Sequence, residues 1–168
     1  MKTLFALLMV LLFVLPSCAR EKTAAPVVGN KAPSFTLKDI DGKAVRLSDF
    51  ADKVVLVDFW ATWCSPCKES MAELEQLHRK YRDRGVVVLG ISMDTGGDAA
   101  SRVRDFANKH HLTYLMLRDD KKTSVSYAVY NIPATYILDR DHRIVKKYPG
   151  YKPGLGKLIA AEIERLLP

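Results

Sequence analysis

The chain has 168 residues, of which 48% are hydrophobic, and carries a formal net charge of +7. This length supports one well-formed hydrophobic core and excludes two domains of ordinary size. The basic residues are scattered, with no basic run interleaved with aromatic side chains, so the composition argues against a nucleic-acid-binding protein.

The first 17 residues have the pattern of an export signal. Lys2 gives a basic start, residues 4–15 contain no polar side chain, and Pro16 and Ser17 precede Cys18. Twelve apolar residues form a helix well short of the ~30 Å hydrocarbon core, which disfavours a permanent membrane-spanning segment. Residues 18–31 show no apolar period and are predicted to be a flexible tether, followed by one folded domain over residues 32–168.

The folded domain is predicted to begin with a β-hairpin. Residues 32–50 read as two short strands around the turn Asp41-Gly42, followed by a brief helical turn at residues 48–50. Residues 54–60 are β-branched and aromatic, which indicates a strand buried on both faces. Asp58 is the one charged residue in that strand, so it is the anomaly that needs an explanation.

Helical spacing starts directly after Trp63. One predicted face is apolar and the other is polar, with a helix end near Gly85; the apolar face holds Met71, Leu74, Leu77 and Tyr81, and the polar face holds Glu73, Glu75, Arg79, Lys80 and Arg82. Pro66 suits the first helical turn, where its missing N–H costs nothing. The sequence therefore predicts that a buried strand leads into a helix at Cys64 and Cys67.

The two cysteines, three positions apart at a helix start, can close a short disulfide. The unpaired N–H groups and the dipole of a helix N-terminus favour a thiolate, so Cys64 is predicted to be an exposed nucleophile of low pKa and Cys67 to be shielded. A buried Asp58 with a raised pKa could accept the proton of Cys67. The alternative for Asp58 is a carboxylate satisfied by a Lys or by backbone donors.

Half of a zinc site is the other interpretation of the cysteine pair. Such a site needs two further ligands at matching spacing. The chain has no second cysteine pair, and the four histidines, at positions 78, 110, 111 and 142, form no ligand pattern with this one. The residues therefore favour redox chemistry, with no metal and no cofactor other than the cysteine pair.

The remainder of the chain alternates predicted strands and helices. Strands are expected at residues 86–91, 112–117 and 143–148, and directly after Pro133, which cannot lie inside a central strand. Helices are expected at residues 98–110 and 124–130, and near the C-terminus, where an apolar stripe comprises Leu155, Leu158, Ile159, Ile163 and Leu166. This alternation indicates an α/β fold with parallel strands at its centre.

Two segments carry a resemblance to a known family. Asp58-Phe-Trp-Ala-Thr-Trp-Cys-Ser-Pro-Cys-Lys68 resembles the active-site segment of thioredoxins, and the Ala-Pro-x-Phe-x-Leu and Leu-Ser-Asp-Phe motifs of residues 32–50 resemble the TlpA/ResA-like, redoxin branch of that superfamily. The resemblance covers residues 32–167. It implies a thioredoxin-like fold, a central mixed β-sheet flanked by helices, with an added N-terminal hairpin and an inserted strand-helix segment.

The resemblance also implies a substrate surface and a location. The segment from Ile132 is similar to the cis-proline loop of the superfamily, so Ile132 and Pro133, with Trp63 beside the cysteines, are expected to bind substrate. Residues 15–18 resemble a bacterial lipobox, which implies that Cys18 is lipidated. The protein is then expected to be exported and anchored by lipid to a bacterial membrane on its periplasmic side.

The chain departs from this branch at the acidic residue near the active site. Many members carry an acid three positions after the second cysteine and a proline two positions later, where this chain has Ser70 and Ala72. The same members often have a neutral amide at the position of Asp58. We therefore hypothesise that the buried acid has moved from the helix to the strand.

The predicted function is a membrane-tethered thiol-disulfide oxidoreductase that reduces protein disulfides. By resemblance, electrons come from a membrane thiol carrier of the DsbD/CcdA type, and apocytochrome c is a client. One alternative is a peroxiredoxin-like thiol peroxidase, although Val57 and Ala61 replace the Pro and Thr/Ser of the peroxidatic frame. The other is a copper metallochaperone that uses the two thiolates but lacks a third ligand.

Overall fold

The computed structural model describes residues 26–168. The predicted signal peptide, residues 1–17, and the predicted lipidation site, Cys18, lie outside the described residues. Within them, none of the helices has the length and apolar composition needed to cross a bilayer.

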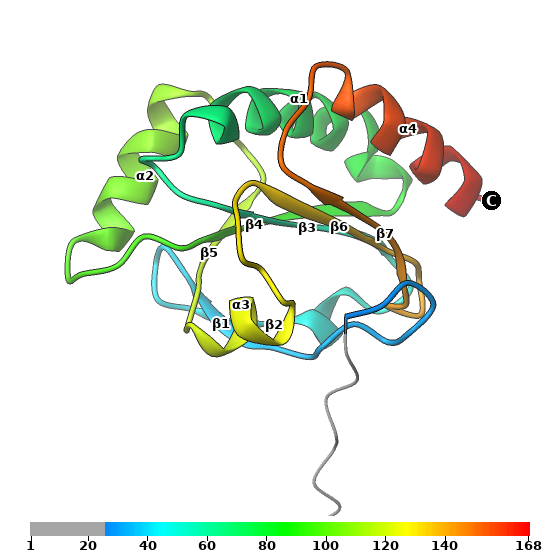
Figure 1. Ribbon diagram of the computed structural model, residues 1–168, viewed down its shortest axis with the longest axis horizontal. Coiled ribbons are helices and arrows are strands. Elements are labelled where there is room, and N and C mark those ends of the chain that lie inside the picture. The colour runs from blue at the N-terminus through cyan, green and yellow to red at the C-terminus, as the bar shows by residue number, and fades with distance from the viewer. Residues whose placement is uncertain (1–25) are drawn as a thin grey trace, which may run out of the picture.

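The described residues form one seven-stranded sheet in the order β2-β1-β5-β4-β3-β6-β7, with helices on both sides (Figure 1). The strands are β1 (Thr36–Asp39), β2 (Ala44–Arg46), β3 (Val54–Trp60), β4 (Val86–Ser92), β5 (Leu115–Arg118), β6 (Ala134–Leu138) and β7 (Ile144–Pro149). The helices are η1 (Leu47–Phe50), α1 (Ser65–Tyr81), η2 (Arg82–Arg84), α2 (Ala99–Lys109), α3 (Lys122–Ser126) and α4 (Leu155–Leu166).

The sheet is mixed, as predicted. Strands β3, β4 and β5 run parallel to one another, whereas β6, β7 and the β1-β2 hairpin pair antiparallel to their neighbours. Helices α1, α2 and α4 cover one face of the sheet, and α3 lies with the hairpin on the other (Figure 1). The hairpin extends the sheet through the β1-β5 pairing, so the fold is thioredoxin-like with the predicted N-terminal and internal additions.

Strand β3 is buried along its whole length, which confirms its predicted central position. Leu56 and Trp60 belong to the core beneath α1, α2 and α4. Val55, Val57 and Phe59 belong to the second core, beneath the hairpin and α3. Because side chains alternate along a strand, Asp58 lies on the α1 side of the sheet, where it is 0% exposed.

The first described residues are joined to the domain. The N–H of Gly29 donates to the carbonyl of Ile144 at 2.8 Å, and the N–H of Ala32 donates to that of His142 at 2.8 Å. Lys31 also forms a β-bridge with Arg143. Residues 29–31, which the sequence pattern assigned to the tether, are therefore part of the ordered domain.

Three predicted details are wrong. Glu75, expected on the polar face of α1, is buried because its carboxylate accepts hydrogen bonds from Thr113. Leu158, expected in the apolar stripe of α4, is 43% exposed. The helix expected at residues 124–130 is α3, which begins at Lys122 and ends at Ser126, so Tyr130 lies in the loop that follows it.

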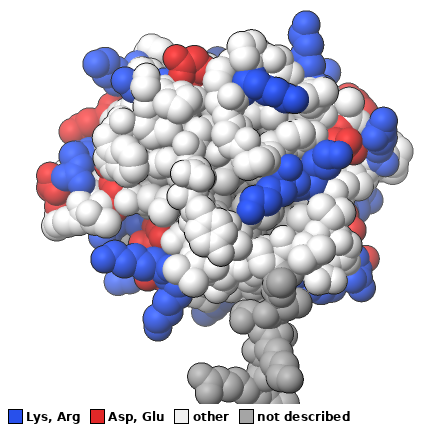
Figure 2. Space-filling model, in the orientation of Figure 1, with Lys and Arg blue, Asp and Glu red and all other residues white. Residues whose placement is uncertain are grey.

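The surface charges are distributed as the composition suggested. Figure 2 shows Lys and Arg side chains spread over the visible face, with Asp and Glu side chains between them. A dispersed positive charge of this kind gives weak, long-range attraction to anionic surfaces.

Candidate redox site

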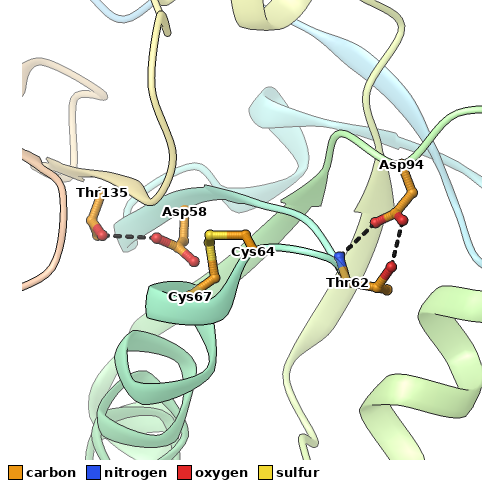
Figure 3. The surroundings of a disulfide bond; sticks show 6 residues. All are labelled: Asp58, Thr62, Cys64, Cys67, Asp94 and Thr135. Atoms are coloured by element: carbon orange, nitrogen blue, oxygen red, sulfur yellow. Dashed lines mark hydrogen bonds between the residues drawn. A yellow bond between two sulfur atoms is a disulfide. The ribbon is translucent and has the colours of Figure 1, made fainter.

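The cysteine pair lies where β3 ends and α1 begins. Cys64 is the N-cap residue of α1, and Pro66 occupies its first turn. The sulfur atoms of Cys64 and Cys67 are bonded at 2.03 Å, with their Cα atoms 5.4 Å apart (Figure 3). The strand-to-helix junction and the disulfide are as predicted, and the helix N-terminus places its unpaired N–H groups beside Cys64.

Both cysteines are buried, to slightly different extents. Cys67 is 0% exposed, which confirms that it is shielded, whereas Cys64 is only 5% exposed. The prediction of an exposed Cys64 is therefore wrong for this disulfide form, because Cys64 packs in the core cluster on the α1 side of the sheet. Trp63, immediately before it, is 71% exposed and presents a large apolar side chain to solvent.

Asp58 is buried beside the disulfide, and its carboxyl group points toward it (Figure 3). Its Oδ1 accepts a hydrogen bond of 2.8 Å from Thr135 Oγ1, while Oδ2 has no hydrogen-bond partner among the described residues. Burial raises the pKa of Asp58 to about 7, and the hydrogen bond from Thr135 opposes this rise. A carboxylate satisfied by Lys or backbone donors does not fit this environment, whereas a group that exchanges a proton near neutral pH does.

Other buried polar atoms, in β3, in α1 and in the segment before β5, also lack hydrogen-bond partners among the described residues. Trp60 Nε1, Ser70 Oγ and Tyr114 OH are each buried and have no hydrogen-bond partner among the described residues. Burial, followed by the charges of Asp58 and Glu75, raises the pKa of Tyr114 well above its ordinary value. Ser70 supplies no ionisable group, so Asp58 is the carboxyl group that the structure places beside the disulfide.

The proline loop lies at the start of β6, next to the strand that carries Asp58. The Ile132–Pro133 peptide bond is cis, as the resemblance implied, and β6 begins at the next residue. Ile132 packs against both cores, and Pro133 is buried. The pairing of β6 with β3 places Thr135 opposite Asp58, so one short segment supplies both the proline and the partner of the acid.

Sequence patterns missed three residues near the site. Thr62 and Asp94 are joined by two hydrogen bonds directly before the cysteines (Figure 3). Tyr130, two residues before Ile132, is 89% exposed. For Asp94, a signal was present in the sequence: the polar residues Ser92 and Asp94 stand at the carboxyl end of a predicted buried strand. Functional residues of α/β sheets often lie at that end of a strand.

The site's remaining side chains offer no metal-binding set. Within residues 26–168 no three or more His, Cys, Asp or Glu side chains are grouped so that they could hold a metal ion. The two sulfurs that could bind a soft metal are bonded to each other in this form. What the arrangement can do chemically is exchange a disulfide and move a proton to or from Asp58.

Comparison with known proteins agrees with this geometry. The AhpC/TSA family matches residues 28–147. The chain is 39% identical over 111 residues to the thioredoxin-like protein YneN of Bacillus subtilis, a match that covers 66% of this chain and 65% of YneN. It is 31% identical over 125 residues to the thiol-disulfide oxidoreductase ResA of Bacillus cereus, covering 73% of this chain and 70% of ResA.

A solved structure supports the same assignment. A protein from Chlorobium tepidum, provisionally identified as the thiol:disulfide interchange protein DsbE, superimposes with a TM-score of 0.77 at 29% identity. The match covers 84% of this chain and 99% of that one. The chain belongs to the AhpC/TSA family and, within it, is a ResA-like thiol-disulfide oxidoreductase with a thioredoxin-like fold.

Proposed function

We propose that the protein reduces disulfides of other proteins while anchored by lipid to a bacterial membrane on its periplasmic side. The observation that carries the reductase assignment is the buried carboxyl group of Asp58, which lies beside Cys67 and has a pKa of about 7. A base of this kind promotes the step in which a reductase releases its substrate.

The first step is attack by Cys64. Its thiolate, favoured by the N-terminus of α1, forms a bond to one sulfur of the substrate disulfide. The substrate S–S bond breaks, and the second substrate sulfur leaves as a thiolate that takes a proton from water. The product is a mixed disulfide between Cys64 and the substrate.

The second step is resolution by Cys67. The Cys67 thiol gives its proton to the Asp58 carboxylate, and the resulting thiolate attacks the Cys64 sulfur. The bond between Cys64 and the substrate breaks, the Cys64–Cys67 disulfide forms, and the departing substrate thiolate is protonated. The substrate has then gained two electrons and two protons, the cysteine pair has lost two electrons, and Asp58 returns its proton to solvent.

The substrate surface is formed by Trp63 and the loop that contains Ile132 and Pro133. The exposed indole of Trp63 offers apolar contact area, and the backbone beside Pro133 offers hydrogen-bonding groups to an extended chain. Recognition through backbone groups requires no particular substrate side chain. This supports unfolded or flexible protein segments as substrates.

The proposed location rests on the N-terminal pattern. A basic start, an apolar segment and the lipobox-like residues before Cys18 support export and lipid attachment at that cysteine. Lipidation also gives the third cysteine a role separate from the redox pair. In an oxidising compartment the disulfide needs a source of electrons, for which a membrane thiol carrier of the DsbD/CcdA type is proposed, with apocytochrome c among the clients.

The reduction potential of the Cys64–Cys67 pair tests the direction of electron flow. We would measure it by equilibration with glutathione or dithiothreitol in the full chain carrying Cys18→Ser, solubilised in detergent. A value near or below that of thioredoxin, about −270 mV, is expected for a reductase. A value near that of DsbA, about −120 mV, would identify a disulfide donor and overturn the proposal.

Substrate trapping then tests the two sulfur roles. Cys67→Ala is expected to accumulate mixed disulfides through Cys64, because the resolving thiol is absent. The matched variant Cys64→Ala is expected to accumulate none, since Cys67 is fully buried. Equal trapping by both variants would contradict the assigned roles.

A further inference from the structure

Asp94 is a buried carboxylate that the exchange steps above do not use. It lies two residues after the end of β4, and its side chain is 1% exposed. Its Oδ2 accepts hydrogen bonds from Thr62 N–H at 2.9 Å and from Ser92 Oγ at 2.8 Å, while Oδ1 accepts one from Thr62 Oγ1 at 2.6 Å (Figure 3). The backbone N–H and the side-chain hydroxyl of Thr62 therefore both donate to the carboxylate of Asp94.

Thr62 lies in the turn that connects β3 to the cysteine pair. Cys64 N–H donates to the carbonyl of Ala61 at 3.1 Å, which closes the turn. Met93 N–H donates to the carbonyl of Trp60 at 2.8 Å, so the segment after β4 contacts the turn at its start as well as at Thr62. Trp63 lies between Thr62 and Cys64 in the chain and is 71% exposed.

The nearby cation, Arg102, is not the main partner that stabilises the buried carboxylate of Asp94. Arg102 Nε lies 3.8 Å from Asp94 Oδ1, but the Arg102 side chain is 40% exposed and also pairs with Asp98 and with the carbonyl of Thr95. The charge of Asp94 is therefore stabilised mainly by the hydrogen bonds from Thr62 and Ser92. A buried carboxylate whose main partners lie in the active-site turn ties that turn to the end of β4.

We propose that Asp94 is a positioning residue for thiol-disulfide exchange: it fixes the turn at Thr62 so that Cys64 stays beside Cys67 when the disulfide is open. While the disulfide is closed, the S–S bond itself holds Cys64. Once the bond opens, the place of Cys64 depends on noncovalent anchors, and resolution requires both sulfurs at close range. The inference rests on exchange at this cysteine pair and holds for either direction of electron flow.

Asp94 has two physical effects on the cysteine pair, and both favour the disulfide over the dithiol. By holding the turn, it raises the effective concentration of one sulfur at the other, which favours the disulfide. By placing a negative charge at Thr62, two residues from Cys64, it disfavours the Cys64 thiolate of the reduced form. Removing the carboxylate therefore makes the disulfide less stable relative to the dithiol.

The chain contains a matched control. Counted over the whole residue, Glu75 is 6% exposed and Asp94 7%, and Glu75 accepts hydrogen bonds from Thr113 N–H and Thr113 Oγ1, both at 2.7 Å. It is eight residues beyond Cys67 in α1, about 12 Å along the helix axis. Loss of the Glu75–Thr113 contact also removes hydrogen bonds between a buried carboxylate and a threonine, but it does not affect the turn before Cys64.

The experiment compares the Asp94–Thr62 contact with the Glu75–Thr113 contact in the full chain carrying Cys18→Ser. We would measure the equilibrium constant for forming the Cys64–Cys67 disulfide from the dithiol with oxidised glutathione. The variants are Asp94→Asn, Thr62→Val, Glu75→Gln and Thr113→Val, and the midpoint of thermal unfolding is measured for each. Asp94→Asn and Thr62→Val are expected to lower the equilibrium constant by about threefold to tenfold, a shift of about 15 to 30 mV to less negative potential. Glu75→Gln and Thr113→Val are expected to lower the thermal midpoint and leave the equilibrium constant unchanged.

A serine at position 62 supplies the rescue. Thr62→Ser keeps the hydroxyl group and is expected to restore the wild-type equilibrium constant that Thr62→Val loses. Equal shifts from Asp94→Asn and Glu75→Gln, or a lower thermal midpoint with no change in equilibrium constant for both Asp94→Asn and Thr62→Val, would reduce Asp94 to a structural role. The proposed direction of electron flow is judged on the wild-type potential alone, so failure of that proposal remains distinguishable from failure of this one.

Discussion

Thr135 Oγ1 donates a hydrogen bond of 2.8 Å to Asp58 Oδ1, although the two residues lie 77 positions apart in the sequence. The antiparallel pairing of β3 with β6 sets them opposite each other. A single neutral donor stabilises the carboxylate less than burial destabilises it, so the pKa of Asp58 stays raised at about 7. This balance is the basis of the first two predictions.

Replacing Asp58 by Asn is expected to change how stability depends on pH. Because the pKa of Asp58 is about 7 in the folded protein and 3.8 normally, the folded chain keeps a proton that the unfolded chain releases across this window. The wild type therefore loses stability, relative to Asp58→Asn, as pH rises from about 4 to about 7, by a total on the order of 4 kcal/mol. Urea unfolding of both proteins at pH 4.5, 6 and 8 measures the difference, and a pH-independent difference would show that Asp58 is not a buried acid of raised pKa.

The pH dependence of the resolving step is expected to reflect the protonation of Asp58. For the wild type, the rate at which a mixed disulfide on Cys64 is released should rise with pH through an inflection near 7, as Asp58 becomes able to accept a proton. Asp58→Asn should abolish this inflection and slow release by about 100-fold. Thr135→Val should instead move the inflection to higher pH, because the lost hydrogen bond had lowered the pKa. Stopped-flow measurement of product release tests this, and an unmoved inflection in Thr135→Val would contradict the role of Thr135.

Trp63→Ala is expected to weaken substrate binding without destabilising the fold. The side chain is 71% exposed, so its loss should change the free energy of unfolding by no more than about 0.5 kcal/mol. Loss of apolar contact to a protein substrate should lower kcat/KM by about 5- to 30-fold, equivalent to about 1–2 kcal/mol. Leu158→Ala, at an exposed apolar position on α4, is the control and should leave turnover of the same disulfide-bonded protein unchanged. A similar loss in both variants would argue against a substrate surface at Trp63.

Glu73→Gln is expected to affect stability and not redox behaviour. The Glu73 carboxylate accepts hydrogen bonds from Tyr151 OH at 3.0 Å, from Gly154 N–H at 3.3 Å and from Gly156 N–H, so it caps the start of α4. Loss of this charged cap should cost about 1–2 kcal/mol of unfolding free energy. Chemical denaturation measures the cost, while an altered reduction potential would mean that Glu73 acts on the cysteine pair after all.

Local sequence patterns determined the elements that build the site. A continuous β-branched and aromatic run identified the doubly buried strand that carries Asp58, and helical spacing with Pro66 identified a helix that starts at the cysteines. Gly85 ends the helical segment in a left-handed conformation, as predicted from its position after the basic residues. These features depend on backbone preferences and on the faces of one element, both of which are encoded within a few neighbouring residues.

Tertiary structure alone decided which side chains meet across elements. The pairing of β3 with β6 gave Asp58 its partner Thr135, and the segment after β4 brought Asp94 to Thr62. The same kind of long-range contact buried Glu75 beside Thr113, although Glu is a polar residue, and packing in the core on the α1 side of the sheet buried Cys64. Periodicity assigns a side chain to a face of its own strand or helix, whereas burial and pKa depend on what another part of the chain places against that face. The sequence of this protein therefore determined where its redox chemistry lies, and the packing of distant segments determined the proton affinity of Asp58 and the groups that hold Thr62.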